Sequence, residues 1–324
     1  MTNNPTILFD PDTYLWLTIA ILAILTLTVS WWLRRSRRRL PALLCLAFLL
    51  FGWYMVIYGA FVEFTRLEVR HVEYASEDLP DAFDGYRIVQ FSDAHLGTYN
   101  GWRQPILRRA IDSINAQKAD LIVFTGDLQN KEPDEIKPNI PLLKQLKAHD
   151  GVCSVMGNHD YPNYVDLDEI HKVANLCETM NTEEDMGWRL LNNTWRRIRR
   201  GEESIVIAGM ENDGEKRFPQ LGDITSALSG LNRKTFVVML EHDPTSWRRK
   251  ILPHSHCQLT LSGHTHGGQF NFFGLSPAMF TYRELGGMYY AGNRALNVST
   301  GLGGVVPIRL GTTPEIVVIT LKKK

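Results

Sequence analysis

The stretch QLTLSGHTHGGQ, residues 258–269, joins an apolar, strand-like run to two histidines and a glycine pair. Glycine lets a backbone bend sharply or approach another group closely. If the segment is extended, His264 and His266 project to the same face, because side chains alternate along a strand with period two. Two imidazoles on one face are typical of a metal site, and the rest of the chain decides whether this pair belongs to one.

The composition sets broad limits. The chain has 324 residues, of which 44% are hydrophobic, enough for one sizeable domain plus an appendage. Lysine plus arginine and aspartate plus glutamate both number 35, so the net charge is zero and we expect no nucleic-acid partner. The four cysteines form no CxxC pair, which predicts neither a disulfide framework nor a cysteine zinc site.

The N-terminal region contains two uncharged runs, residues 13–33 and 40–62, separated by RRSRRR at 34–39. Each run reaches the roughly 20 residues that a helix needs to cross a bilayer. We therefore predict a membrane anchor at residues 1–63, made of two transmembrane helices. The alternative is a pair of buried helices in a soluble bundle, which rarely contains uncharged runs of this length.

Charge predicts the orientation of this anchor. Five arginines in a short loop favour the cytoplasmic side of the membrane, which places the remainder of this multi-pass chain outside the cytoplasm. Ser36-Arg37-Arg38 also loosely resembles a twin-arginine export signal. However, the apolar run is long for a cleaved signal, and Tyr58-Gly59-Ala60 lacks a small residue at the first cleavage-site position. A retained anchor is the favoured interpretation.

After a predicted connector at 64–85, apolar runs alternate with amphipathic stretches, which indicates an α/β fold. Strands are predicted at 86–92, 120–126 and 151–157, and helices at 103–119, 141–148 and 165–180. Further strands are predicted at 189–195, 204–210, 235–241, 258–263, 295–300 and 314–321. The first two of these flank RRIRRGEE, which predicts a hairpin.

Metal-capable side chains follow five of these strands. They are Asp93 and His95, then Asp127, then Asn158 and His159, then His242, and finally His264 and His266. Loops at the carboxyl ends of strands are where α/β sheets bind ligands. Mixed oxygen and nitrogen ligands suit Mn, Fe, Zn or Co better than Ca. Among these side chains, a carboxylate can bridge two cations, whereas an imidazole cannot.

This series of motifs resembles the calcineurin-like metallophosphoesterases over about residues 86–321. The motifs are SDAHLG, GDLQN, GNHD, EHDP and GHTHGG. With the two apolar helices and the closing STGLGGVVPIRLGTTPEIVVITL, the chain is similar to a membrane-anchored bacterial branch. That branch includes phosphodiesterases and some UDP-2,3-diacylglucosamine pyrophosphatases. The resemblance implies a two-sheet α/β/β/α sandwich at residues 86–324, preceded by a transmembrane helical hairpin.

The resemblance also implies a site with two divalent transition metal ions, with Mn, Fe and Zn left open. Asp93, His95, Asp127 and His266 would hold one ion, and Asp127, Asn158, His242 and His264 the other. Asp127 would be the bridge. The two charges would lower the pKa of a shared water, and the resulting hydroxide would attack phosphorus in line.

His159 and its neighbour Asn158 are the predicted catalytic residues, with His159 facing the substrate and stabilising or protonating the leaving oxygen. Many members of the family carry an aspartate three residues after the bridging one to support this histidine, but here that position is Asn130. An amide can orient an imidazole without stabilising its cation as a carboxylate does. We therefore expect a weaker acid, and Asn130→Asp should raise activity on poor leaving groups.

The predicted reaction is hydrolysis of a phosphodiester, pyrophosphate or phosphomonoester. The anchor favours a lipid-linked substrate, although a UDP-lipid is made in the cytoplasm while the arginines place the domain outside. A non-catalytic binding platform on the same fold would have lost ligands, whereas all seven expected ligand positions are filled. A protein phosphatase of this fold would show GDxxDRG and GNHE, where this chain has GDLQN and GNHD. No protein partner is predicted.

Overall fold

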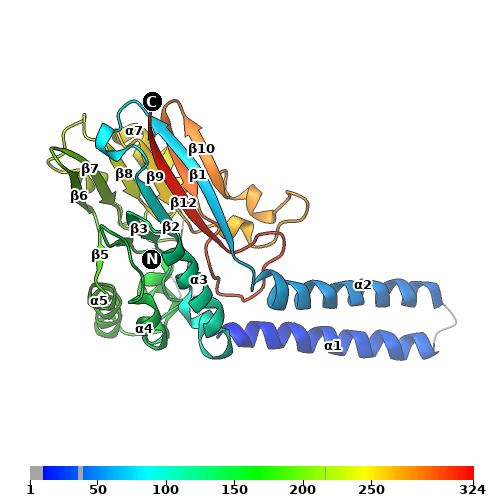
Figure 1. The fold of residues 1–324 in the computed structure, drawn as a ribbon. Helices are drawn as coiled ribbons and strands as arrows, with labels where there is room; N and C mark the ends of the chain where they lie inside the picture. The colour runs from blue at the N-terminus through cyan, green and yellow to red at the C-terminus, as the bar shows by residue number, and fades with distance from the viewer. Residues whose placement is uncertain (1–9, 36–38, 216) are drawn as a thin grey trace.

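Two long antiparallel helices project from a two-sheet domain in the computed structural model, which describes residues 10–35, 39–215 and 217–324 (Figure 1). They are α1 (Pro11–Arg35) and α2 (Arg39–Tyr58). Their most apolar windows have mean hydropathies of 1.9 and 2.3 and are only 6% and 11% buried. Both helices are thus long and apolar enough to span a membrane, and they lack the burial of core helices.

The expected spans 13–33 and 40–62 fall on these helices, the second continuing through a helical turn at Gly59–Glu63. Within the hairpin, the Trp53 indole donates a 3.1 Å hydrogen bond to the Thr26 hydroxyl. The proposed export motif at 36–38 lies outside the described residues.

The first sheet is built around strands that are buried on both faces. Its order is β1 (Glu68–Ser76), β12 (Glu315–Lys323), β2 (Arg87–Phe91), β3 (Leu121–Thr125), β4 (Val152–Val155) and β5 (Trp188–Leu190). From β2 to β5 the strands are parallel, and β12 runs antiparallel to β2. The segment LIVFT of β3 is buried at every position, as expected for a parallel strand covered on both sides.

The second sheet has the same number of strands. Its order is β10 (Gly287–Ala291), β11 (Arg294–Val298), β9 (Leu259–Ser262), β8 (Val237–Leu240), β7 (Glu203–Gly209) and β6 (Thr194–Arg200). The central strands are parallel, and the edge strands β10 and β6 are antiparallel to their neighbours.

The apolar core is divided into layers. Side chains such as Ile88 and Val238 pack between the two sheets, whereas Phe91 and Ile111 belong to the layer between the first sheet and its helices. Trp247 fills a third layer outside the second sheet. The helices are α3 (Gln104–Ala116), α4 (Ile140–Leu143), α5 (Glu169–Asp185), α6 (Ile224–Ala227) and α7 (Leu252–His254). The predicted two-sheet α/β/β/α sandwich is confirmed.

The prediction of a connector at 64–85 is wrong for much of that range. Strand β1 lies there, and all of its residues pair with β12. Tyr74 is buried there, and its hydroxyl donates to the backbone carbonyl of Gln258. β1 escaped prediction because it is an edge strand whose charged residues blur the apolar alternation, as edge strands often do.

Three smaller predictions also need correction. The strand expected at 189–195 is two strands in different sheets, β5 and β6, with Asn193 in a left-handed conformation between them. The hairpin exists, but its arginines lie in β6 and the turn falls at Gly201. The helix expected at 141–148 is the single turn α4, because α-helical structure ends at Leu143.

The helical hairpin is fixed to the domain by polar and apolar contacts. Asp12 of α1 pairs with the buried guanidinium of Arg103 at 2.6 Å. Leu15 is buried with Ala60, Ile308 and Leu310. The base of the hairpin therefore packs against the segment 306–310, which runs close to the predicted site.

Candidate dinuclear metal site

All the predicted site residues meet at the carboxyl ends of strands from both sheets. Strands β2, β3 and β4 of the first sheet contribute Asp93, His95, Asp127, Asn158 and His159. Strands β8 and β9 of the second sheet contribute His242, His264 and His266. Because parallel strands end at the same edge, short sequence motifs more than a hundred residues apart come into contact.

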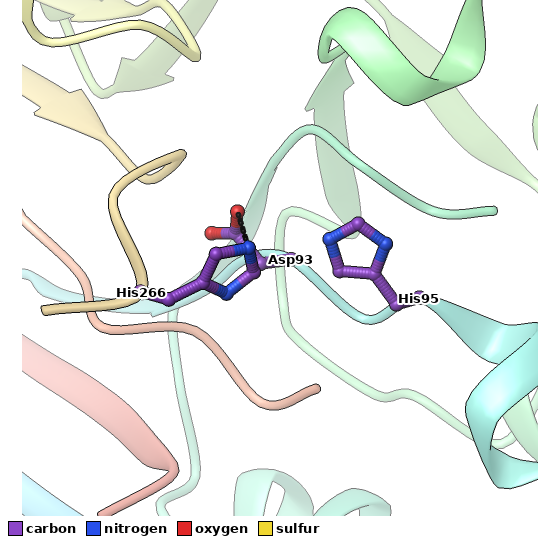
Figure 2. A group of neighbouring side chains, drawn as sticks. All are labelled: Asp93, His95 and His266. Carbon is purple, nitrogen blue, oxygen red and sulfur yellow. Dashed lines mark ion pairs between the residues drawn. The ribbon is translucent and has the colours of Figure 1, made fainter. Parts of the chain in front are cut away.

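One group of possible ligands consists of Asp93, His95 and His266, whose ligand atoms lie within 4.8 Å of one another. Figure 2 shows the Asp93 carboxylate beside the His266 ring, with 3.7 Å between Oδ1 and Nε2. Asp93 and His95 are fully buried. The arrangement offers one carboxylate and two imidazoles to a single cation.

A second group consists of Asp127, His242 and His264, again with ligand atoms within 4.8 Å of one another. The Nδ1 of His242 lies 2.7 Å from the carbonyl oxygen of Thr125. A carbonyl only accepts hydrogen bonds, so Nδ1 carries the proton and Nε2 is left for a cation. The Nδ1 of His264 lies 3.3 Å from this Nε2.

Asp127 lies between the two groups. Its Oδ2 is 3.2 Å from Nε2 of His242 and 3.5 Å from Nε2 of His95. Its other oxygen, Oδ1, accepts a 2.8 Å hydrogen bond from the backbone of His159. One carboxylate therefore faces both groups, which is the geometry that a bridging ligand needs.

The backbone at the site is unusual. Nine described non-glycine residues have a positive φ, and five of them are predicted ligands: Asp93, His95, Asp127, His264 and His266. A left-handed conformation costs energy in a residue with a Cβ, so it persists where the surroundings enforce it. Such conformations cluster at functional sites, and here they turn successive side chains into the space between the sheets.

Two glycines allow the loops to approach Asp93. A Cβ on Gly263 would lie 2.3 Å from Oδ2 of Asp93, and one on Gly301 would lie 2.6 Å from its Cβ. Only glycine leaves this space free. The backbone N–H of His264, next to Gly263, donates to the Asp93 carboxylate at 3.0 Å.

Asn158 is oriented by a residue that the sequence analysis did not single out. Its Nδ2 donates a 2.7 Å hydrogen bond to the hydroxyl of Tyr164. Its Oδ1 is buried and has no hydrogen-bond partner among the described residues. The amide therefore presents its oxygen, the atom that binds cations.

His159 is held by a different atom of Asn130 than we expected. The carbonyl oxygen of Asn130 lies 2.6 Å from Nδ1 of His159, so the backbone orients the imidazole. The Asn130 side chain instead donates to Thr98 at 3.4 Å. The expectation that the Asn130 amide supports His159 is thus wrong, and with it the reason for expecting Asn130→Asp to strengthen the acid.

Asp160 joins two of the loops. Its carboxylate accepts hydrogen bonds from the backbone amides of Asp127, Leu128, Gln129 and Gly157. These bonds bind the loop after β3 to the loop after β4. Asp160 therefore fixes the relative positions of Asp127 and Asn158 from outside both ligand groups.

Unpartnered polar atoms test whether these residues suit metal ions. Both ring nitrogens of His95 and the Oδ1 of Asn158 are buried without a hydrogen bond among the described residues. Buried polar atoms are normally satisfied, since leaving them unpaired is costly. A cation would satisfy the Asn158 oxygen and one nitrogen of His95, and the mixed oxygen and nitrogen donors suit a divalent transition metal.

The electrostatics centre on Asp127. Burial alone would raise its pKa, but His242 and His159 outweigh burial and hold the pKa well below its usual value. Burial opposes the charged form of His242, yet the Asp127 carboxylate raises the pKa of that ring to about 10. Burial lowers the pKa of His95 to about 3. The Asp127 carboxylate thus favours positive charge at His242, whereas His95 stays neutral, the form in which an imidazole binds metal.

Three residues touch the site without having been predicted. Tyr164 stacks on His159 with ring centroids 4.1 Å apart, and the Tyr282 hydroxyl lies 2.9 Å from Nε2 of His264. The buried guanidinium of Arg309 lies 3.4 Å from Nδ1 of His266. No local motif marks these residues, although Tyr164 follows GNHD by four positions.

Comparisons with known proteins identify the family of this chain. The family model for calcineurin-like phosphoesterases matches residues 86–268. The metallophosphoesterase YkuE of Bacillus subtilis strain 168 is 34% identical, over 82% of this chain and 89% of its own. A transmembrane protein with metallophosphoesterase domain from Danio rerio is 28% identical, over 83% of this chain but only 60% of its own.

Among solved structures, the phosphopantetheinyl hydrolase PptH of Mycobacterium tuberculosis aligns with a TM-score of 0.42 and 12% identity, over 67% of this chain and 89% of its own. The family model spans more than half of the described sequence and ends just beyond the two histidines of GHTHGG. This chain belongs to the calcineurin-like phosphoesterases and is a metal-dependent phosphoester hydrolase, for which the family implies a dinuclear divalent metal centre.

Proposed function

We propose that the chain is a membrane-anchored phosphoesterase that uses two divalent transition metal ions, chosen among Mn, Fe and Zn. One ion is held by Asp93, His95, Asp127 and His266, and the other by Asp127, Asn158, His242 and His264. The observation that carries the proposal is the position of Asp127, whose Oδ2 lies 3.2 and 3.5 Å from histidines of the two groups.

The ions supply Lewis-acid activation of water and neutralisation of charge at phosphorus when they are bound. The protein positions the reacting groups. Nδ1 of His159 donates to the carbonyl of Asn130, which leaves Nε2 as the ring atom that exchanges a proton with a substrate oxygen. Stacking on Tyr164 limits rotation of the ring. Asp160 holds the loops of Asp127 and Asn158 together, so the ligands are in place before substrate binds.

We place the protein in the inner membrane of a bacterium, with the catalytic domain on the extracytoplasmic side. The two apolar helices support an anchor, and five arginines within 34–39 support the orientation. The substrate is a phosphodiester, a pyrophosphate or a phosphomonoester. A lipid-linked substrate is favoured, since the ion pair between Asp12 and Arg103 keeps the site close to the hairpin.

Hydrolysis by the full chain in detergent tests the activity. The substrates are an aryl phosphomonoester, an aryl phosphodiester and a UDP-linked lipid pyrophosphate, each with Mn, Fe, Zn or chelator. We expect metal-dependent turnover that Asp127→Asn abolishes and that Asp112→Asn, an exposed position on α3, preserves. Turnover that is equal in the two variants would refute the assigned site, and the preferred substrate identifies the bond that is cleaved.

The native Cys177, exposed on α5, reports the orientation. A thiol reagent that does not cross membranes should label it in intact spheroplasts that produce the full chain. Cys177→Ser controls for labelling elsewhere, since Cys45 is also exposed in the structure. Labelling of Cys177 only after lysis would place the domain in the cytoplasm.

A further inference from the structure

The segment between β9 and β10 carries an exposed apolar surface. We call residues 270–280 the apolar loop. Phe273 and Phe280 are 105% and 95% exposed, and Leu275 is 69% exposed. The sequence contains no Asp, Glu, Lys or Arg between His266 and Arg283. Concentrated apolar exposure of this kind marks a surface that contacts something other than water.

The tip of the apolar loop is a tight turn with an unfavourable residue. Phe272 and Leu275 exchange backbone hydrogen bonds of 2.8 and 3.0 Å across Phe273 and Gly274. Both central residues have a positive φ, 54° for Phe273 and 85° for Gly274. Such turns favour Asn-Gly, because a bulky side chain is strained there. In water, Phe273 would thus combine backbone strain with full exposure of a large aromatic ring.

The apolar loop lies next to the base of the helical hairpin. The amide of Asn271 donates to the carbonyl of Leu310 at 2.7 Å, and the amide of Arg309 donates to the carbonyl of Gly59 at 3.2 Å. The loop is therefore connected to the end of α2 through these two hydrogen bonds and the adjacent residues Arg309 and Leu310. Figure 1 shows the segment before β10, in light orange, at the end of the domain from which α1 and α2 leave.

A second apolar feature lies at the same base. Phe61, in the last turn of the second apolar helix, stacks on Trp102 with ring centroids 5.9 Å apart. Both rings are about half exposed, at 43% and 54%. Tryptophan is enriched at the interface between a membrane and water. Exposed aromatic rings therefore also occur where the helices enter the domain.

We propose that the apolar loop inserts into the interface of the same bilayer that α1 and α2 span. This inference rests on the proposed membrane anchor. The continuity with the hairpin base identifies the bilayer as the occupant, because any surface at that level faces lipid headgroups once the helices are inserted. Aromatic and aliphatic side chains without charge are the groups that enter this layer.

Insertion of the apolar loop would also set the position of the metal site relative to the bilayer. The apolar loop begins four residues after His266, and Tyr282, whose hydroxyl lies 2.9 Å from Nε2 of His264, follows its end. The hydroxyl of Ser276, inside the loop, donates to the carbonyl of Gly268, which lies between His266 and the loop. The loop and the site therefore form one unit, and the substrate class is a phosphoester whose phosphate lies at the headgroup level of this bilayer.

A nitroxide at position 273 measures the depth of the loop. The full chain with Cys45→Ala, Cys177→Ser and Phe273→Cys is labelled and reconstituted in phosphatidylcholine–phosphatidylglycerol vesicles. The matched control is Asp81→Cys. The Asp81 side chain is 85% exposed, and the residue follows the end of β1 that lies away from the hairpin. We expect collisions with a water-soluble nickel chelate to fall several-fold at 273 relative to 81, and collisions with oxygen to rise.

Equal nickel accessibility at the two positions would overturn the proposal. A label immobilised at 273 without the rise in oxygen collisions would also overturn it, because a second copy or a protein partner would then cover the loop. In a second variant, Phe273→Ser with Phe280→Ser, a label at Leu275→Cys should lose its protection from nickel, whereas Phe273→Leu with Phe280→Leu should keep it.

Hydrolysis of a soluble aryl phosphate separates this proposal from the proposed function. The Phe273→Ser, Phe280→Ser chain should hydrolyse it at the unchanged rate, because neither residue contacts a metal group. If the unmodified chain does not hydrolyse this ester with any metal, the proposed activity fails, while the depth measurement still decides whether the apolar loop inserts.

Discussion

The side-chain amide of Asn158 donates a 2.7 Å hydrogen bond to the hydroxyl of Tyr164. The bond decides which end of the amide faces the site, because Nδ2 is engaged and the buried Oδ1 has no hydrogen-bond partner among the described residues. The same tyrosine ring stacks on His159. One aromatic side chain therefore positions two residues of the site.

Tyr164→Phe should lower metal-dependent hydrolysis roughly 10-fold or more, the usual effect of removing a group that orients a metal ligand. The ring and its stack on His159 remain, so the melting temperature should change little. Tyr290→Phe, at a position that is 59% exposed, is the matched control. Full activity of Tyr164→Phe with every metal would show that Asn158 needs no such orientation.

Gly263→Ala should disrupt the first ligand group. The new Cβ would lie 1.9 Å from the Ser92 hydroxyl and 2.3 Å from Oδ2 of Asp93, so the carboxylate must move. A shift of about 1 Å at a reacting centre costs on the order of 100-fold in rate. Metal content and hydrolysis should fall together in this variant.

Gly304→Ala is the control for this prediction, since its Cβ would make only an ordinary contact, 3.6 Å from the carbonyl of Val306. A Gly263→Ala chain with unchanged metal content and rate would mean that Asp93 does not bind metal in the observed position.

Asp12→Asn should loosen the hairpin from the domain. Asp12 is the ion-pair partner of Arg103, whose side chain is only 2% exposed. Loss of the pair should cost about 1 kcal/mol, since Asp12 itself is half exposed and partly screened. The thermal unfolding of the full chain in detergent measures the loss.

Asp10→Asn is the matched control. Asp10 pairs with Lys131 at the surface, where the Asp10 side chain is 75% exposed. The melting temperature of this variant should stay unchanged. If both variants melt like the unmodified chain, the Asp12–Arg103 pair does not hold the hairpin.

The metal groups could be predicted from the sequence because their residues sit in short motifs directly after buried strands. Strand ends are local features, and the shared edge of a sheet gathers them whatever the intervening loops do. The left-handed backbone at Asp93, His95 and Asp127 has the same local origin, since the chain must turn at the point where each strand stops. The GHTHGG motif then added residues of the second sheet to the predicted site.

Other features depend on contacts that no local pattern encodes. β1 is stabilised by its pairing with β12, more than 240 residues away, and its own residues are largely polar. Tyr282 reaches His264 through the path of the apolar loop. His159 is held by a backbone carbonyl, which any residue at position 130 would provide. Side-chain identity at that position therefore could not reveal the contact.

The number of metal ions bound per chain tests directly whether Asp127 bridges a dinuclear centre. The full chain, the Asp127→Asn chain and the Asp112→Asn control are each loaded with Mn or Zn, washed, and analysed for metal content. We expect two ions per chain for the unmodified protein and the control, and we expect Asp127→Asn to abolish or greatly weaken the binding of both ions. Two tightly bound ions in Asp127→Asn, or a single ion in the unmodified chain, would contradict it.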